Sequence, residues 1–344
     1  MEVTGATSKV QYASLRQGTW TAAVTLVDSP DLFVNWADTP KITRGGDGAL
    51  YAYWPLKSGE DTYAYDVVLG RSADDGETWT ELGKPHDDGT QTEHGFVSLV
   101  PTRTGIEVIW LDGRAIASDG PMSLRSAAVG EKIGPTVLVD DSVCDCCGTD
   151  AAQTVEGPVV VYRDRTEEEI RDIGIVRREG DKWAVPSMVF PDRWKIAGCP
   201  VNGPRVLGRG RSVDVIWFTS QPEPAVQFAV SRDGGRSFGR PMRFAGAQTL
   251  GRVDLVADGK TSVLLSWMDV VEDQAVIRVS RYYRTGQALK PFDVASTSAG
   301  RASGFPRMAI VGDEVYVFWT GEGPKLAYER VFLEDLNTDS RLKK

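Results

Sequence analysis

The chain has 344 residues, 41% of them hydrophobic, and a formal net charge of −9. The negative charge argues against nucleic acids and anionic membranes as partners, and no apolar segment reaches the length of a transmembrane helix, which excludes membrane insertion. The first residues, Met-Glu-Val-Thr-Gly-Ala, carry no basic and apolar signal regions. We therefore expect a cytoplasmic protein, or a periplasmic or secreted one if a signal peptide has been removed.

Short strand-like runs that end on an aromatic residue recur along the chain, and the steps between them are 56, 52, 55, 50 and 52 residues. Repeats of this length, each with four short strands, are typical of propeller blades. The sequence predicts an all-β fold in one domain, residues 1–344: a six-bladed β-propeller of four-stranded antiparallel blades, starting near residues 36, 93, 146, 199, 251 and 303. The aromatic residues are Trp54, Trp110, Tyr162, Trp217, Trp267 and Trp319.

The last repeat runs out after residues 325–333, one strand short of the others. Residues 19–27 (Thr-Trp-Thr-Ala-Ala-Val-Thr-Leu-Val) read as a strand with no place in the first repeat. We therefore predict that this segment is the missing fourth strand and closes the ring.

Two segments fit the pattern Ser-x-Asp-x-Gly-x-Thr/Ser-aromatic, at residues 72–79 and 231–238. In such a turn the Asp side chain bonds the turn backbone and Gly supplies a positive φ. The pattern resembles the Asp-box, or BNR repeat, of the sialidase-like propellers. The resemblance covers essentially the whole chain through the blade period, and it implies a structural role for both turns, between strands three and four and away from the axis.

The antiparallel order of each blade brings the start of strand one and the end of strand two to the same end of every blade. The unusual residues of the chain gather on this predicted face. They are Asp38, Glu93, His94, Asp112, Arg114, Cys144, Cys146, Cys147, Arg163, Cys199, Asn202 and Arg252.

The resemblance to sialidases implies an Arg triad for the sialic carboxylate, a Tyr nucleophile paired with Glu, and an Asp acid/base. Where the family has its first Arg, this chain has Ala-Asp-Thr-Pro at residues 37–40, and Asp38 would repel an anionic substrate. The position of the nucleophilic Tyr is taken by Phe305. We therefore expect that the protein is not a sialidase.

All four cysteines fall in the loops that open the third and fourth predicted blades. Thiolates from adjacent blades, with an imidazole in reach, predict a site for copper or zinc. The predicted ligands are Cys144, Cys146, Cys147, Cys199 and His94. Two other interpretations remain open: a disulfide within the 144–147 loop with a second one to Cys199, or reactive thiols.

The same face also suits a hydrolase of glycoside-hydrolase type that acts on a glycan or another polar small molecule. Its acids or bases would be Glu93, Asp38 and Asp112, and its substrate-binding residues Arg114, Arg163, Arg252 and Asn202. A third hypothesis is a recognition propeller without catalysis. His86, in a loop beyond the first Asp-box-like turn, is predicted to be exposed.

Overall fold

The structure is a computed structural model that describes residues 2–4, 7–321, 323 and 325–337. The all-β prediction is confirmed, because the described residues form antiparallel sheets and only short 3-10 turns: η1 (Ile116–Ser118), η2 (Arg301–Ser303) and η3 (Asp335–Asn337). None of these helical turns has the length or the apolar character needed to cross a membrane. The chain divides into two compact units, residues 1–153 and 154–344, and each is described by itself.

The first unit begins with a sheet of order β1-β2-β5, made of β1 (Glu2–Thr4), β2 (Thr7–Tyr12) and β5 (Val24–Ser29). The segment predicted as one strand over residues 19–27 is divided. Thr19–Trp20 is β4, paired with β3 (Leu15–Arg16), and β5 pairs with β2. The reason is the two-residue turn Gln17-Gly18, whose positive φ values of 50° and 78° fold residues 19–20 back in a hairpin. Closure of a ring by this segment remains a prediction.

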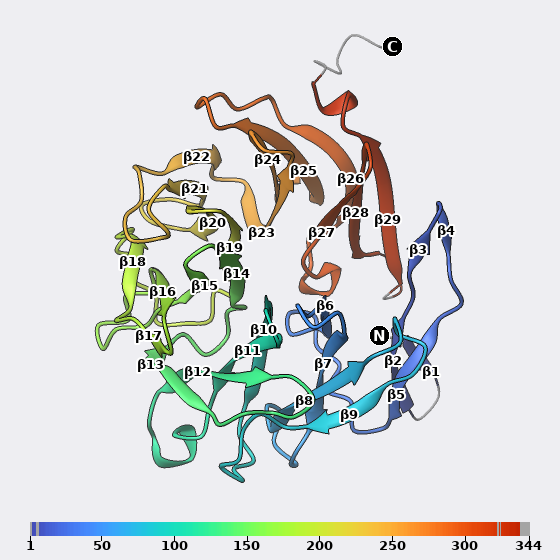
Figure 1. Cartoon of the computed structure of the whole chain (residues 1–344). Coiled ribbons are helices and arrows are strands. Elements are labelled where there is room, and N and C mark those ends of the chain that lie inside the picture. Colours follow the sequence, from blue (N-terminus) through green and yellow to red (C-terminus); the bar gives the residue numbers. More distant parts are fainter. Residues whose placement is uncertain (1, 5–6, 322, 324, 338–344) are drawn as a thin grey trace. The chain divides into compact units, whose positions relative to one another are not determined.

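Two four-stranded antiparallel sheets follow in the first unit, each with its strands in chain order, as predicted for blades (Figure 1). The first holds β6 (Lys41–Arg44), β7 (Leu50–Lys57), β8 (Tyr65–Ser72) and β9 (Thr80–Gly83). The second holds β10 (His94–Thr102), β11 (Gly105–Asp112), β12 (Met122–Val129) and β13 (Val137–Val143).

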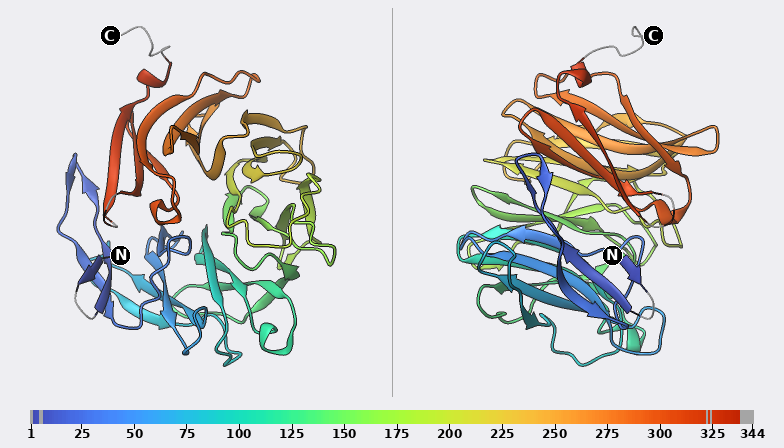
Figure 2. Two further views of the ribbon diagram at one scale, coloured as in Figure 1. Left: turned by 180° about the vertical axis from the view of Figure 1, so that it is seen from behind. Right: turned by 90° about the vertical axis from the view of Figure 1, so that its right-hand side faces the viewer.

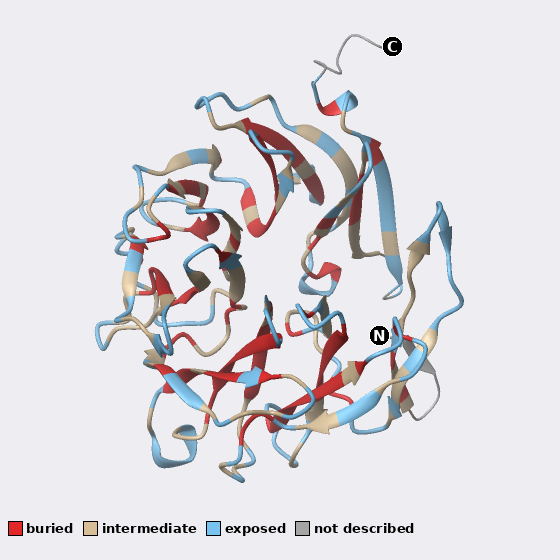
Figure 3. Cartoon of the chain, in the orientation of Figure 1, coloured by how far each residue is buried: buried red, intermediate tan, exposed pale blue. Residues whose placement is uncertain are grey.

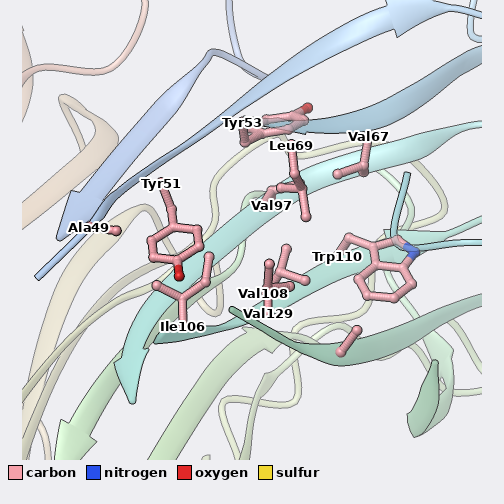
Figure 4. Packing of buried hydrophobic residues seen from close by; sticks show 11 residues of the cluster. Ala49, Tyr51, Tyr53, Val67, Leu69, Val97, Ile106, Val108, Trp110 and Val129 are labelled. Atoms are coloured by element: carbon pink, nitrogen blue, oxygen red, sulfur yellow. The ribbon is translucent and has the colours of Figure 1, made fainter. Parts of the chain in front are cut away.

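The core of the first unit lies between these two sheets. Tyr53, Val67, Val97 and Trp110 lie in one buried cluster that draws on both sheets (Figure 4). Figure 3 shows the same distribution by burial, with buried central strands and more exposed outer strands such as β9. Burial of apolar surface contributes about 25 cal/mol per Å², which is why the alternating apolar positions of β7, β8, β10 and β11 determine how the sheets pack.

A second cluster attaches the N-terminal sheet to the β6–β9 sheet. Val10 of β2 and Leu32 pack against Trp54 and Val68, so the two sheets lie side by side in the blue part of the chain (Figure 2).

The second unit repeats the antiparallel arrangement. In its first sheet β15 (Gly157–Arg163) pairs with β16 (Ile173–Glu179), and β16 pairs with β17 (Lys182–Trp183) and β18 (Ser187–Phe190). The next sheet has four strands, β19 (Arg205–Arg209), β20 (Ser212–Thr219), β21 (Ala225–Ser231) and β22 (Met242–Ala245). The sheet after it also has four strands, β23 (Thr249–Asp258), β24 (Ser262–Val271), β25 (Gln274–Tyr283) and β26 (Phe292–Ser298). The described residues of the last sheet form three strands, β27 (Arg307–Val311), β28 (Glu314–Thr320) and β29 (Leu326–Phe332). β14 (Asp150–Thr154) lies at the boundary of the units.

The two Ser-x-Asp-x-Gly segments form the same hydrogen-bonded turn. Asp74 Oδ1 accepts from the hydroxyl of Ser72 at 2.7 Å and from the backbone N–H of Thr78 at 2.9 Å. These hydrogen bonds, those from Thr78 above all, lower the pKa of Asp74 to about 2. The turns connect β8 to β9 and β21 to β22, so they join the third and fourth strands of their sheets.

Candidate functional site

Three thiols gather in the turn that follows β13. Residues 145 and 146 form the turn, and Cys144 and Cys147 stand at its two ends. The sulfur of Cys144 lies 3.8 Å from that of Cys146 and 3.6 Å from that of Cys147. Cys144 and Cys147 are 0% and 1% exposed, whereas Cys146 is partly exposed. None of the four cysteines is joined in a disulfide, so neither predicted disulfide is present in this structure.

The spacing of these thiols suits a metal ion. The three sulfur atoms all lie within 4.8 Å of one another. A tetrahedral ion with metal–sulfur bonds of about 2.3 Å holds its sulfur ligands about 3.8 Å apart. Cys144, Cys146 and Cys147 could therefore hold a metal ion. Cys199 is exposed and belongs to the loop before β19 in the second unit, and its part as a ligand remains a prediction.

Asp38 lies in the loop before β6 and is 1% exposed. Its Oδ2 accepts hydrogen bonds from the hydroxyl of Tyr53 at 2.9 Å, the hydroxyl of Tyr65 at 3.0 Å and the backbone N–H of Phe96 at 2.8 Å. Its Oδ1 is buried and has no hydrogen-bond partner in the described part of the chain. Burial raises the pKa of Asp38 above its usual value, although these hydrogen bonds act in the opposite direction.

Tyr65 brings Asp38 together with Glu93, another predicted acid or base. The Tyr65 hydroxyl lies 3.1 Å from Glu93 Oε1, so both carboxylates contact one phenolic oxygen. Burial, together with the charges of Asp38 and Glu93, raises the pKa of Tyr65 well above its usual value. The sequence analysis did not single out Tyr65, although its place at the start of the third strand, on the predicted face, was a usable signal.

The backbone at Gly95 and Phe96 is shaped to reach Asp38. The pairing of β10 with β11 shifts register between Gly95 and Ser98, and Phe96 has a φ of 50°. A side chain on Gly95 would collide with Asp38 and Tyr65. An aromatic residue with positive φ is strained, and such strain persists where the surrounding structure fixes it; here it directs the N–H of Phe96 at the carboxylate.

The two histidines of the chain meet in a second cluster of the first unit. The rings of His86 and His94 stack with centroids 3.9 Å apart and planes 5° from parallel. His94 Nε2 lies 3.1 Å from Asp88 Oδ2, and Asp66 Oδ1 lies 3.7 Å from His86 and 3.8 Å from His94. The prediction that His86 is exposed was wrong, because the loop after β9 turns inward and buries its ring on His94. Burial and the charge of His94 lower the pKa of His86 to about 4.

His94 was predicted to join the thiols, and the structure places it among aspartates. It is not among the described residues that gather within 4.8 Å of the three thiols, whereas Asp66, His86 and His94 form a group of their own that could hold a metal ion. Because the two imidazole rings are nearly parallel, the lone pairs of their nitrogens lie in two separate planes. His86 and His94 could therefore bind the same ion only after one ring turned.

Asp112 is fully buried at the end of β11, where it is paired with the guanidinium group of Arg114. It accepts from the indole N–H of Trp110 at 2.9 Å and from Arg114 through two bonds of 2.7 and 2.9 Å. Although burial acts to raise it, the pKa of Asp112 is lowered, chiefly by the hydrogen bond from Arg114. Arg114 also lies 3.3 Å from Asp88, so it connects Asp112 to the histidine cluster.

In the second unit, Asn202 connects the two predicted anion-binding arginines. Arg163 is buried and donates to the carbonyls of Asn202, Arg171 and Phe218 at 2.6 to 3.2 Å. The backbone N–H of Arg252 donates to Asn202 Oδ1 at 2.8 Å. Arg252 Nη1 donates to the Ser303 hydroxyl at 2.6 Å. These guanidinium bonds hold loops through neutral oxygens, and a substrate-binding role for the three residues remains a prediction.

Comparison with known proteins finds a likeness of structure only. No family model and no curated protein sequence matches the chain. An intramolecular trans-sialidase from Ruminococcus gnavus superposes with a TM-score of 0.61 at 11% identity, over 90% of this chain and 97% of that one. An intramolecular trans-sialidase from leech gives 0.57 at 12% identity over 89% of this chain and 69% of that one, and an α-L-arabinanase from Penicillium chrysogenum gives 0.54 at 11% over 89% and 96%.

Proposed function

We propose that this chain, which has the fold of the sialidase-like β-propellers, binds one soft metal ion through Cys144, Cys146 and Cys147. The observation that carries the proposal is the approach of three thiol sulfurs to within 4.8 Å in one turn. Thiolates select soft ions such as Cu(I) and Zn(II) over magnesium and calcium.

The burial of the site supports the same conclusion. Cys144 and Cys147 are shielded from water, which strengthens binding to a cation and protects the thiolates from competing ligands, while the partly exposed Cys146 gives an ion a route of entry. Three thiolates complete a trigonal Cu(I) site. A structural zinc site takes a fourth ligand, for which Cys199 is the candidate from the sequence.

The test is elemental analysis of protein purified with a reductant and without a chelator, then loaded with Cu(I) or Zn(II). We expect about one equivalent per chain in the wild type and loss of the metal in Cys146→Ser and Cys147→Ser. Ser142→Ala, two residues before the first cysteine, is the matched control and should keep the ion; circular dichroism checks that each variant is folded. Cys199→Ser separates the metals, because it should weaken zinc and leave Cu(I) bound. A wild type that takes up neither ion, or serine variants that keep it, would refute the proposal.

A second candidate function is hydrolysis of a glycan or another polar small molecule at Asp38, Tyr65 and Glu93. It is supported by the contact of both carboxylates with the Tyr65 hydroxyl. It is also supported by the raised pKa of Asp38, which suits a proton donor. Glu93 would act as the base. The trans-sialidases and the arabinanase with this fold are named for glycan substrates.

This candidate is tested with a panel of chromogenic glycosides and esters. If a substrate is turned over, Glu93→Gln should lower kcat by about a hundredfold or more, the range of general acid–base catalysis. Asp74→Asn should leave the rate unchanged, because Asp74 lies in the turn beyond the other end of β8 from Tyr65. Absence of turnover over the whole panel, with protein shown to be folded, would count against a hydrolase.

A further inference from the structure

We infer that the three-thiol site is also a two-electron redox couple, in which oxidation joins Cys144 to Cys147 and releases the metal ion. The release rests on the proposed metal binding. The disulfide itself does not, because it depends only on the thiols and their turn.

The turn selects the pair that is joined. Cys144 and Cys147 are its first and fourth residues, and the Cα atoms of such residues lie within about 7 Å. A disulfide needs Cα atoms about 4.4 to 6.8 Å apart. The two sulfurs already lie 3.6 Å apart, so side-chain rotation brings them to bonding distance. A bond from Cys146 to Cys144 or to Cys147 closes a smaller and more strained ring.

The difference in exposure defines the route of oxidation. Among the three thiols of the turn, Cys146 is the partly exposed one and therefore meets a small-molecule disulfide before Cys144 or Cys147 does. Its thiolate attacks one sulfur of the oxidant, the S–S bond of the oxidant breaks, and one small thiolate leaves. The thiolate of Cys144, 3.8 Å away, then attacks the Cys146 sulfur and expels the second small thiolate.

One exchange completes the sequence. Cys147 attacks the Cys144 sulfur, the 144–146 bond breaks, and Cys146 leaves as a thiolate. Two protein thiols have then lost two electrons and two protons, and one small disulfide has become two thiols. The metal site keeps one of its three thiolates, so the ion is lost. A small dithiol reverses the reaction and restores the site.

The experiment treats the full chain, loaded with Zn(II) or metal-free, with glutathione disulfide. Free thiols, released metal and the disulfide link are followed by thiol titration, a chromogenic chelator and peptide mapping. We expect the loss of two of the three turn thiols, a link between Cys144 and Cys147, release of the bound ion, and recovery of all four thiols with dithiothreitol. Cys146→Ser should form the same link about tenfold or more slowly, and Cys147→Ser should not form it.

The outcomes separate the two ideas. A metal-free protein that forms the 144–147 link but never binds an ion removes the metal proposal and leaves the couple in place. Metal binding with four thiols that survive excess glutathione disulfide, or with a mapped link other than 144–147, overturns the couple. Retention of the ion after the link has formed overturns the release.

Discussion

Asp38 in the first unit and Asn202 in the second each hold a backbone segment by a hydrogen bond, Asp38 through a carboxylate and Asn202 through a neutral amide. Each accepts the backbone N–H of a positive-φ residue that follows a glycine: Phe96 after Gly95, and Arg252 after Gly251, both at 2.8 Å. Since a neutral amide suffices in the second unit, the charge of Asp38 is not needed to hold this backbone.

This comparison predicts the stability of two variants at position 38. Asp38→Asn keeps an acceptor for the N–H and hydroxyl groups and removes a buried ionisable group, so we expect the free energy of unfolding to stay within about 1 kcal/mol of the wild type. Asp38→Ala leaves three donors without their acceptor and should cost about 2–4 kcal/mol. Urea denaturation measures both values. Equal losses in the two variants would show that the charge itself holds the loop.

At the scale of elements, the two Ser-x-Asp-x-Gly turns hold the outer strands to their sheets. Asp233 Oδ1 accepts from the Ser231 hydroxyl at 2.7 Å and from the backbone N–H of Ser237 at 3.0 Å, and Asp74 makes the same bonds in the first unit. The turn connects β21 to β22, which pairs with β21 from its first residue, Met242. The Asp233 side chain accepts the backbone N–H groups of Arg236 and Ser237 in the turn itself.

The turn predicts a graded loss of stability. Asp233→Ala removes these bonds and should lower the free energy of unfolding by about 1–2 kcal/mol. Asp233→Asn keeps one acceptor oxygen and should lower it by about half as much. Denaturation at neutral pH compares the two variants with the wild type. An alanine variant of unchanged stability would mean that the turn backbone holds without the side chain.

Strand ends show a second recurring element. The indole of Trp110 donates to Asp112 at 2.9 Å, and that of Trp267 donates to Asp269 at 3.0 Å, each two residues further along the strand. Asp112 thereby anchors the end of β11, and its bidentate pair with Arg114 holds it ionised. Of the three carboxylates predicted as acids or bases, Asp112 is the one whose contacts best explain a structural role.

At the scale of the whole molecule, one half-buried carboxyl group, that of Asp192, should change how the free energy of unfolding depends on pH. Asp192 accepts from the indole N–H of Trp217 at 2.6 Å. Burial, aided by the charge of Asp172, raises the pKa of Asp192 from 3.8 to about 6. Between these two values the folded chain keeps a proton that the unfolded chain releases. The free energy of unfolding therefore falls as the pH rises from about 4 to 6, by up to about 3 kcal/mol.

Asp192→Asn tests this expectation because it keeps an acceptor for Trp217 and cannot ionise. In denaturation series from pH 4 to pH 7, the free energy of unfolding of the variant should rise relative to that of the wild type between pH 4 and about pH 6. Above that pH the difference between the two proteins should stay constant. The charge background of −9 is nearly common to both proteins and cancels in the difference. A difference that does not change with pH would place the pKa of Asp192 near its ordinary value.

The sequence by itself determined the features that depend on neighbouring residues. The aromatic period and its alternation gave the all-β class and the antiparallel sheets, and the Ser-x-Asp-x-Gly pattern gave both turns. The Cys-Asp-Cys-Cys run fixed the three-thiol cluster, because residues one to three positions apart in a turn cannot separate.

Only the tertiary structure decided which distant loops meet. The contact of Asp38 with Tyr65 spans 27 positions, that of Asp38 with Phe96 spans 58, and the stacking of His86 on His94 reverses an expectation of exposure. These contacts depend on strand register, and the shift between Gly95 and Ser98 changes which residues face Asp38. A one-residue shift moves side chains to the opposite face of a sheet. The register shift cannot be predicted from the sequence pattern, because the shift arises from packing between segments that are far apart in the chain.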